Sequence, residues 1–193
     1  MKVIAWWSGG VTSAVACKMA IDRFGVDNVQ ILFIDTHNED DDTYRFMKDC
    51  QKWYGTLIGS ITGIGSKYKH ISDVWLRYKS LNVSYGAVCS SELKRSVRER
   101  WEKDNEWDYQ VFGFDWSEYK RAKGLKLNHG HTKPLFPLLG DALTKEDCVR
   151  IVQDAGLELP RMYQMGFLNN NCAKTLCVQG GIGYWQKARA MGS

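Results

Sequence analysis

The sequence lacks the features that mark membrane and small secreted proteins. It has no run of about 18 consecutive apolar residues, which excludes a membrane-spanning helix. Its N-terminus has no charged segment followed by an apolar core and a cleavage site, so we expect a cytoplasmic chain with no membrane partner. Six cysteines are too few and too scattered for a disulfide framework. In a reducing compartment they would be thiols, ligands or catalytic groups.

The sequence also lacks internal repeats, low-complexity segments, linkers and a strong excess of one charge. The net charge of +4 permits an anionic substrate without requiring a polyanion. A chain of 193 residues with 44% hydrophobic and 25% charged residues fits one folded domain. We expect a single domain over residues 1–193. Residues 1–122 would form the core sheet and its helices, and residues 123–193 a less regular C-terminal extension.

Apolar runs alternate with helical periodicity along the first half of the chain. The runs predict strands at 3–7, 29–35, 57–62 and 109–115, and the periodicity predicts helices at 12–24, 40–54, 72–79 and 90–103. This alternation predicts an α/β fold with a doubly wound, mainly parallel sheet and helices on both faces. Residues 123–139, with two prolines, predict an irregular connection. A capping box at Thr144 and Asp147 predicts a helix that ends at Gly156, and a closing helix is expected near 184–190.

A glycine-rich turn, Ser8-Gly9-Gly10-Val11-Thr12-Ser13, joins the first strand to the first helix. At such a junction, backbone N–H groups and the helix dipole can hold phosphate oxygens. The spacing fits neither the dinucleotide-binding G-x-G-x-x-G pattern nor the Walker A pattern, and no lysine follows. A plain tight turn would explain the glycines, but it would not explain the three hydroxyls clustered around them.

The motif Ser-Gly-Gly-x-x-Ser after a first strand resembles the pyrophosphate loop of the adenine nucleotide alpha-hydrolase superfamily, the PP-loop ATP pyrophosphatases. Segments at 33–36, 88–95, 134–147 and 163–172 resemble, in order, its phosphoadenylyl-sulfate (PAPS) reductase-like branch. The resemblance implies that an adenine nucleotide, ATP or an adenylyl sulfate such as PAPS, binds above the first, second and fourth strands. Phosphate contacts would come from Ser8, Gly9, Gly10, Thr12 and Ser13, and the rest of the pocket from Asp35, Thr36 and Gly113.

The sequence departs from the family pattern at two places in this site. Thr12 stands where the superfamily usually has an aspartate, so a carboxylate that could hold Mg²⁺ is missing. Asp35, also a catalytic candidate, or the acidic residues 39–42 could replace it, although acidic residues also simply suit a helix start. The family's first arginine after Gly113 is absent. Arg121, further on, is either a catalytic contact for phosphate or sulfate or a surface residue.

Three cysteines form a partial family motif. Cys89, Cys172 and Cys177 resemble the cysteines of iron–sulfur members, with Ser90 at the fourth place and two extra residues within the last pair. They could hold a [4Fe–4S] cluster, contribute to a zinc site, or bind no metal. Cys89, at a basic helix start near Lys94, is also a candidate for a reactive thiolate. The other cysteines, at 17, 50 and 148, are predicted to be small buried hydrophobes.

Three functions remain open from the sequence. The first is ATP-dependent adenylation of an acceptor, either a small molecule, tRNA or DNA, coupled to sulfur transfer. The second is reduction of a sulfonucleotide, which fits less well because those enzymes attack sulfur with a cysteine near the C-terminus and none follows Cys177. The third is a non-catalytic nucleotide sensor or an accessory subunit of a nucleic-acid modification complex. A homodimer is compatible with each function.

Overall fold

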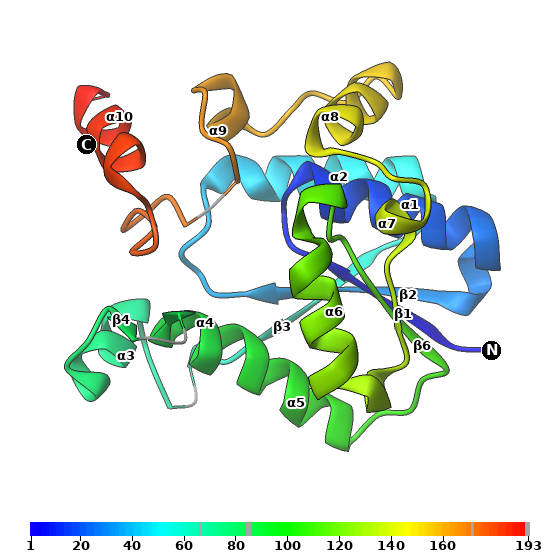
Figure 1. The fold of residues 1–193 in the computed structure, drawn as a ribbon, viewed down its shortest axis with the longest axis horizontal. Coiled ribbons are helices and arrows are strands. Elements are labelled where there is room, and N and C mark those ends of the chain that lie inside the picture. The colour runs from blue at the N-terminus through cyan, green and yellow to red at the C-terminus, as the bar shows by residue number, and fades with distance from the viewer. Residues whose placement is uncertain (66, 84–85, 171, 192–193) are drawn as a thin grey trace.

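Five parallel strands form the central sheet, in the order β3-β2-β1-β6-β7 (Figure 1). They are β1 (Val3–Trp7), β2 (Val29–Asp35), β3 (Ile58–Thr62), β6 (Tyr109–Phe112) and β7 (Pro134–Leu135). The short strands β4 (Asn82–Val83) and β5 (Gly86–Ala87) form a separate antiparallel pair. This computed structural model describes residues 1–65, 67–83, 86–170 and 172–191.

Helices cover both faces of the sheet, as the sequence predicts. One face carries α1 (Val11–Phe24), α2 (Asp41–Tyr54), α7 (Pro137–Gly140) and α8 (Lys145–Asp154), and the other carries α5 (Ser96–Lys103) and α6 (Tyr119–Asn128). Alternate residues of β1 face opposite sides: Val3 and Trp7 pack with the α1 side, and Trp6 packs against Trp101 of α5 at a ring distance of 5.5 Å. The doubly wound α/β fold is therefore confirmed.

The remaining helical elements are short. They are α3 (Ile71–Tyr78), α4 (Val88–Ser90), α9 (Arg161–Gln164) and α10 (Ile182–Ala190), the 3₁₀ turns η1 (Val26–Asn28), η3 (Trp116–Glu118) and η4 (Gly130–Thr132), and the π-helical segment η2 (Ser91–Arg95). The helix predicted over 90–103 is thus three consecutive pieces, α4, η2 and α5. The strand predicted to reach residue 115 ends at Phe112, because Asp115 leaves the sheet and caps η3 through its side chain.

The region predicted to be irregular is more ordered than expected. Residues 123–128 complete α6, whose Ala122 and Leu125 pack towards the sheet. Residues 134–135 form β7, which pairs with β6, so the sheet extends past residue 122. Prolines fit such an edge strand because they are not required to donate ladder hydrogen bonds there. The helix predicted from the Thr144 capping box is confirmed as α8, which packs on α1.

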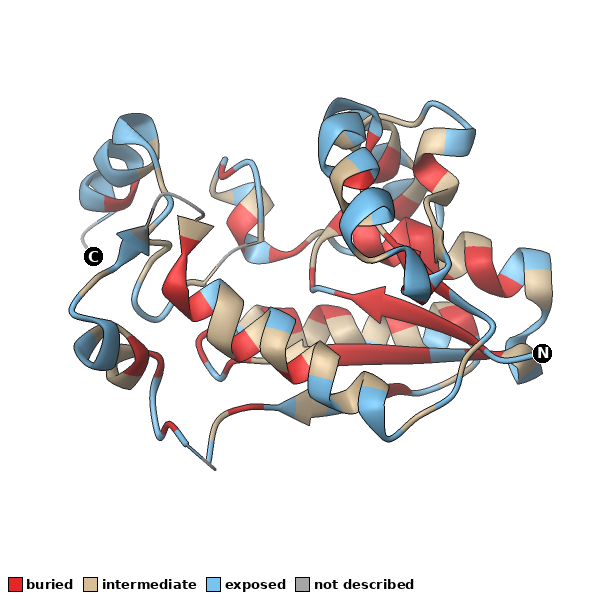
Figure 2. Ribbon diagram, turned by 60° about the horizontal axis from the view of Figure 1, so that its bottom comes forward, coloured by how far each residue is buried: buried red, intermediate tan, exposed pale blue. Residues whose placement is uncertain are grey.

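Two small apolar clusters lie beyond the carboxyl ends of the strands. One joins α3 to α4 and η2 through buried Ile71, Val74 and Leu93, and the other joins α9 to α10 through Met162, Phe167 and Ala188. Figure 1 places α3, β4 and α10 at the end of the molecule towards which the strand arrows point, and Figure 2 shows the buried residues concentrated along the sheet. Among the described residues, no helix is long and apolar enough to cross a membrane.

Candidate functional site

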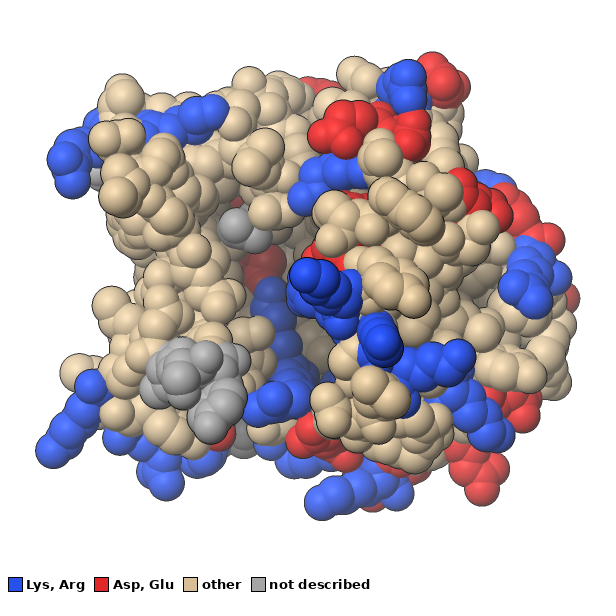
Figure 3. All heavy atoms as spheres, in the orientation of Figure 1, with Lys and Arg blue, Asp and Glu red and all other residues tan. Residues whose placement is uncertain are grey.

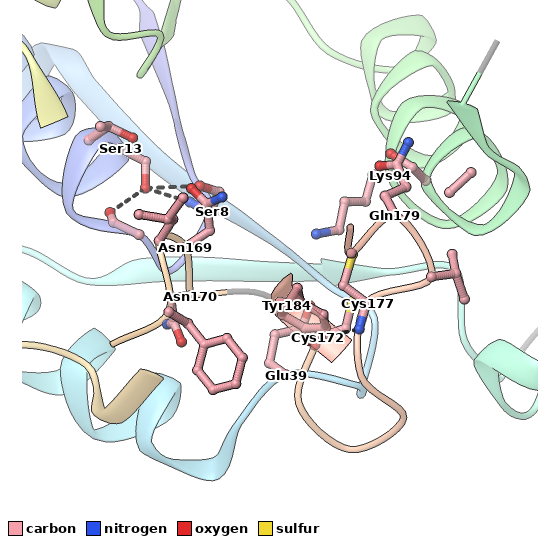
Figure 4. A pocket seen from close by; sticks show the side chains of 18 of the residues that line it. Ser8, Ser13, Glu39, Lys94, Asn169, Asn170, Cys172, Cys177, Gln179 and Tyr184 are labelled. Carbon is pink, nitrogen blue, oxygen red and sulfur yellow. Dashed lines mark hydrogen bonds between the residues drawn. The ribbon is translucent and has the colours of Figure 1, made fainter. Parts of the chain in front are cut away.

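A cavity of about 1040 Å³ opens at the carboxyl ends of β1, β2 and β6. Its walls come from the turns that follow these strands, from α4 and η2, and from the segment between Tyr163 and Lys187. Open α/β sheets bind ligands at this edge, and the volume lies at the upper end of ordinary ligand pockets. Figure 4 shows Ser8 and Ser13 on one side of the cavity and Lys94, Cys177 and Gln179 on the other.

The turn after β1 is braced by its own hydroxyls. Ser13 Oγ donates to the Gly10 carbonyl oxygen at 2.8 Å, accepts from Ser8 N at 3.0 Å and lies 3.1 Å from Ser8 Oγ. Gly9 has a φ of 84°, and a Cβ there would lie 2.8 Å from Thr43 Cγ2 on α2. Gly10 caps α1 without a side-chain hydrogen bond. The first N–H groups of α1 therefore sit at the cavity wall in the arrangement that suits an anion.

Two residues from the C-terminal segment support this turn, and the sequence analysis assigned neither of them a role. Tyr163 Oη accepts a hydrogen bond from Val11 N at 3.3 Å. Asn170 Nδ2 donates to the Gly9 carbonyl oxygen at 2.8 Å and lies 3.0 Å from Thr43 Oγ1. The run of asparagines before Cys172 was the available signal, although it indicates only a loop; its last member, Asn171, lies outside the described residues.

Gly113 belongs to the cavity wall and also allows a close backbone approach. A Cβ at this position would lie 2.6 Å from Ser13 Cα and 2.7 Å from Ser13 N. These are backbone atoms, which cannot move aside without shifting α1. Gly113 therefore lets the end of β6 rest directly against the start of α1.

The acidic residues at the end of β2 and after it differ in whether they line the cavity. Thr36 and Glu39 line the cavity, whereas Asp35 is absent from the lining among the described residues. Both carboxylate oxygens of Asp35 lie 3.0 Å from Tyr44 Oη, and one accepts from His37 N at 2.7 Å. Burial and the neighbouring Asp35 raise the pKa of Tyr44, so its hydroxyl remains a donor to that carboxylate.

Glu39 is the member of the acidic cluster that faces the cavity. Its carboxylate, on a residue only 5% exposed, accepts from Thr36 Oγ1 at 2.8 Å and from Asn38 N at 3.0 Å. Asp40 instead forms a bidentate ion pair with Arg161, at 2.7 and 2.8 Å. The sequence could not separate these neighbours, because Arg161 is distant along the chain and only the fold brings it to α2.

The turn after β6 supplies an aromatic wall and the predicted arginine. Phe112 and Phe114 line the cavity, and Phe114 stacks on Phe136 at a ring distance of 5.7 Å. Arg121 lines the cavity near its mouth, lies 4.8 Å from the centre of the Phe114 ring and forms an ion pair with Glu118. The guanidinium is therefore positioned at the rim and is already paired with a carboxylate.

The three candidate metal-binding cysteines line the same cavity. Cys89 is buried in α4, and Cys172 forms an isolated antiparallel bridge with Glu39. Burial raises the pKa of the Cys172 thiol, although the positive charge of Lys94 opposes this effect. Cys177 N donates to Tyr184 Oη at 3.0 Å. Within the described part of the chain, no three His, Cys, Asp or Glu side chains are grouped so that they could hold a metal ion.

This donor set, as arranged, fits neither a zinc ion nor a four-iron cluster. Mg²⁺ makes smaller demands on the protein, because it commonly uses one or two carboxylates together with substrate phosphates and water. Glu39, Asp115 and Glu118 are the acidic residues that line the cavity. The prediction that Cys17, Cys50 and Cys148 are buried is confirmed, and burial raises the pKa of Cys50 and of Cys148 to about 12.

Comparisons with known proteins agree with this architecture. Residues 2–72 match the family model of the phosphoadenosine phosphosulfate reductase domain. No curated protein matches the chain at a significant level. Among solved structures, the phosphate complex of phosphoadenylyl-sulfate (PAPS) reductase from Candida auris has a similar fold, with a TM-score of 0.60 and 15% sequence identity over 86% of this chain and 78% of that chain. The resemblance inferred from the sequence is thus confirmed as a similarity: residues 2–72 match the PAPS reductase domain model, and the α/β fold is similar to that of a solved PAPS reductase.

Proposed function

We propose that this protein is an enzyme that binds ATP in the cavity, uses it to adenylate a second substrate, and couples that step to sulfur transfer. One observation carries the proposal: the glycine turn at Ser8–Ser13 and two cysteines, Cys172 and Cys177, line opposite parts of one cavity (Figure 4). A volume of about 1040 Å³ is large enough for a nucleotide and the reacting part of a second molecule.

The phosphate end is arranged before any ligand arrives. Ser13 fixes the turn from within, and Tyr163 and Asn170 hold it from outside. Backbone N–H groups that are held in place can stabilise charge on a departing pyrophosphate without reorganising. Mg²⁺, when bound, would neutralise the phosphates, with Glu39 as its protein contact. The flat faces of Phe112 and Phe114 offer an apolar surface to the base.

The proposed chemistry has two steps. An oxygen of the acceptor attacks the α-phosphorus of ATP, the bond to the β-phosphate oxygen breaks, and pyrophosphate leaves. The acceptor carbon now bears an adenylated oxygen. A sulfur nucleophile then adds to that carbon, and the oxygen departs with AMP. Lys94 lines the cavity and can offset the negative charge that both steps create.

The cysteine end would deliver the sulfur, because Cys172 and Cys177 line the cavity with the nucleotide turn. One thiol, loaded as a persulfide by an external sulfur donor, would add its outer sulfur to the acceptor carbon as AMP leaves. The second thiol would then attack the inner sulfur, release the thiolated acceptor and leave a disulfide for an external thiol to reduce. Burial raises the pKa of the Cys172 thiol, which disfavours its thiolate, the nucleophilic form of a cysteine. We derive no step through a metal cluster, because the described thiols are not grouped as ligands of one metal.

Reduction of a sulfonucleotide is the second candidate. It is supported by the family model matched by residues 2–72 and by the similarity of the fold to PAPS reductase from Candida auris. In this reaction a thiolate would attack the sulfur of a nucleotide-bound sulfate, and the nucleoside phosphate would leave. The same two cysteines face the same turn, so the two candidates differ chiefly in which nucleotide the cavity prefers.

The first prediction compares two glycines that share a left-handed backbone conformation. Gly9 has a φ of 84° and Gly55 a φ of 69°, but only Gly9 has a close neighbour where a Cβ would be added. Gly9→Ala should weaken binding of α,β-methylene-ATP with Mg²⁺ at least tenfold, because the turn must move away from Thr43. Gly55→Ala, at the end of α2, carries a similar backbone cost and should bind normally. Isothermal titration calorimetry measures both affinities.

The same titration separates the candidate reactions. Tighter binding of the ATP analogue than of adenylyl sulfate or PAPS supports adenylation, and the reverse order supports sulfonucleotide reduction. If no adenosine derivative produces heat of binding, both enzymatic proposals fail. Pyrophosphate release from ATP in the presence of a nucleophilic acceptor then distinguishes turnover from simple nucleotide sensing.

A further inference from the structure

The helix α6 carries an uncompensated positive surface beside the cavity. Its ten residues include Lys120, Arg121, Lys123 and Lys126 and no acidic residue. Within the described residues, the three lysines have no carboxylate at ion-pair distance; only Arg121 is paired, with Glu118. Figure 3 shows Lys and Arg atoms gathered over the position of α6, next to the central hollow. Such a cluster favours a polyanionic ligand.

Two large aromatic side chains accompany these lysines in water. Trp116 is 52% exposed and Tyr119 is 59% exposed, and both lie within one helical turn of Lys120. The two rings are therefore accessible to a ligand beside the unpaired lysines. In proteins that bind single-stranded nucleic acid, unpaired bases stack on exposed aromatic rings, and neighbouring lysines and arginines contact the phosphates. We call Trp116, Tyr119, Lys120, Lys123 and Lys126 the α6 ridge.

The α6 ridge is continuous with the cavity. Ser117, Glu118 and Arg121, which lie between its members in the sequence, line the cavity mouth. Lys94, Lys145 and Lys187 also line the cavity. A chain of phosphates that lies on the α6 ridge would therefore meet further cations at the cavity, where Glu118 is paired with Arg121 and the carboxylates of Asp115 and Glu39 also belong to the lining.

The dimensions favour a single strand over a duplex. The cavity has the volume of a ligand pocket, so it can admit one nucleotide that has left a base stack but not a double helix. Exposed rings likewise require unpaired bases for stacking. A folded protein partner would gain little from three unpaired lysines unless it were strongly acidic, and it would have no use for their continuity with the nucleotide site.

We propose that the α6 ridge binds single-stranded nucleic acid and delivers one of its nucleotides to the cavity as the acceptor. This inference rests on the proposed function, since it names the acceptor class of that reaction. The phosphates would contact Lys120, Lys123 and Lys126, and the bases on either side of the delivered nucleotide would stack on Trp116 and Tyr119.

The second prediction is tested by fluorescence anisotropy with labelled twelve-nucleotide single-stranded RNA, single-stranded DNA and duplex DNA. Lys120→Glu/Lys123→Glu should weaken single-strand binding at least tenfold and make the salt dependence of binding shallower. Trp116→Ala/Tyr119→Ala should weaken it by a similar factor with little change in salt dependence. The matched control is Lys48→Glu/Lys52→Glu, the same charge change on exposed lysines of α2, across the sheet. It should bind like the wild type.

Binding of α,β-methylene-ATP keeps this test separate from that of the proposed function. Both α6 variants should bind the nucleotide normally, because none of the four residues lines the cavity among those described. Tighter binding of either single strand than of the duplex supports the inference, and the ratio of RNA to DNA affinities identifies the preferred sugar. Equal oligonucleotide affinity in the wild type and the α6 variants, or preference for the duplex, overturns it even if ATP still binds. Loss of nucleotide binding by the wild type would instead overturn the proposed function.

Discussion

Contacts between individual atoms determine the shape of the glycine turn at Ser8–Ser13, and the closest of them is made by Gly113. The start of α1 rests against Gly113 Cα so closely that a methyl group would lie 2.6 Å from Ser13 Cα. The contact is between backbone segments, so no side-chain rotation can relieve it. The geometry of the turn therefore depends on a residue about a hundred positions further along the chain.

The third prediction follows from this contact. Gly113→Ala should lower the free energy of unfolding by about 1–3 kcal/mol, the range for overpacking a filled site, and should also weaken nucleotide binding. Gly124→Ala is the control, because a Cβ at Gly124 in α6 would meet no atom within 4 Å. It should raise stability by roughly 0.5–1 kcal/mol through helix propensity alone. Urea denaturation compares the two, and equal stability in both variants would contradict the close approach.

At this scale the sequence predicted the types of residue in the site better than their orientation. It picked out the turn residues and the cysteines, which the fold brings to one cavity. It placed Asp35 in the nucleotide pocket, whereas the side chain bonds to Tyr44 on α2. The orientation of Asp35 depends on the position of the Tyr44 hydroxyl, nine residues further along the chain, and the local sequence pattern does not predict that position. The roles predicted for Asp35, Arg121 and Cys89 in catalysis stay predictions.

Among the secondary-structure elements, η2 links the cavity to the outlying helix α3. Glu92 in η2 accepts hydrogen bonds from Tyr78 Oη at 2.6 Å, Tyr68 Oη at 2.8 Å and Lys67 Nζ at 3.0 Å. These donors, with Tyr78 the strongest, lower the pKa of Glu92 to about 2. Lys94, two residues further on, faces the cavity, so this ion-pair cluster also fixes the segment that carries it.

The fourth prediction concerns the pH range in which Glu92 stabilises the fold. Its folded pKa lies below the ordinary value of about 4.3, so the stabilisation is complete above that value and is lost as the pH falls towards 2. Glu92→Gln should cost on the order of 1 kcal/mol at pH 7, after solvent screening, and almost nothing near pH 2. Thermal denaturation at pH 7, 4 and 2.5 measures the difference, with Glu106→Gln, an exposed residue, as the control. A cost that is independent of pH would show that the effect is not electrostatic.

Strands were predicted more accurately than their connections. The apolar runs at 3–7 and 29–35 match β1 and β2 because both lie in the middle of a sheet covered on two faces, where continuous apolar sequence is required. In contrast, β7 has two residues, one of them proline, and gives no periodic signal. The π-helical turn of η2 was also invisible, since it changes the hydrogen-bond register without changing the hydrophobic pattern.

The whole molecule has one large apolar core around the sheet and two smaller apolar clusters. The cavity lies between the core and these two clusters. The sheet and its helices share an extensive buried core, whereas the groups around Tyr68–Leu93 and Met162–Ala188 bury few residues each. Local unfolding is easiest where few apolar contacts oppose it. The wall of the cavity formed by the sheet and its helices is therefore rigid, whereas the wall formed by the two small clusters can unfold locally at a lower free-energy cost.

The fifth prediction tests this division by hydrogen exchange. Without ligand, amides of α3 and α10 should exchange faster than those of β1, β2 and α1. Saturating nucleotide should slow exchange in residues 163–180 as well as in the glycine turn, because Tyr163 and Asn170 connect the two. Gly9→Ala should remove this protection. Protection confined to the glycine turn would show that the two walls are not coupled through these side chains.

The strand order has a consequence for how the chain is made. The central strand β1 is translated about a hundred residues before its partner β6, and Tyr163 follows later still. At roughly 5–20 residues per second, the two tryptophans of β1 wait several seconds on the ribosome for one side of their sheet. A nascent chain of this topology consequently leaves these indole rings without one of their flanking strands during synthesis, and the glycine turn gains its contacts with Tyr163 and Asn170 only after those residues emerge.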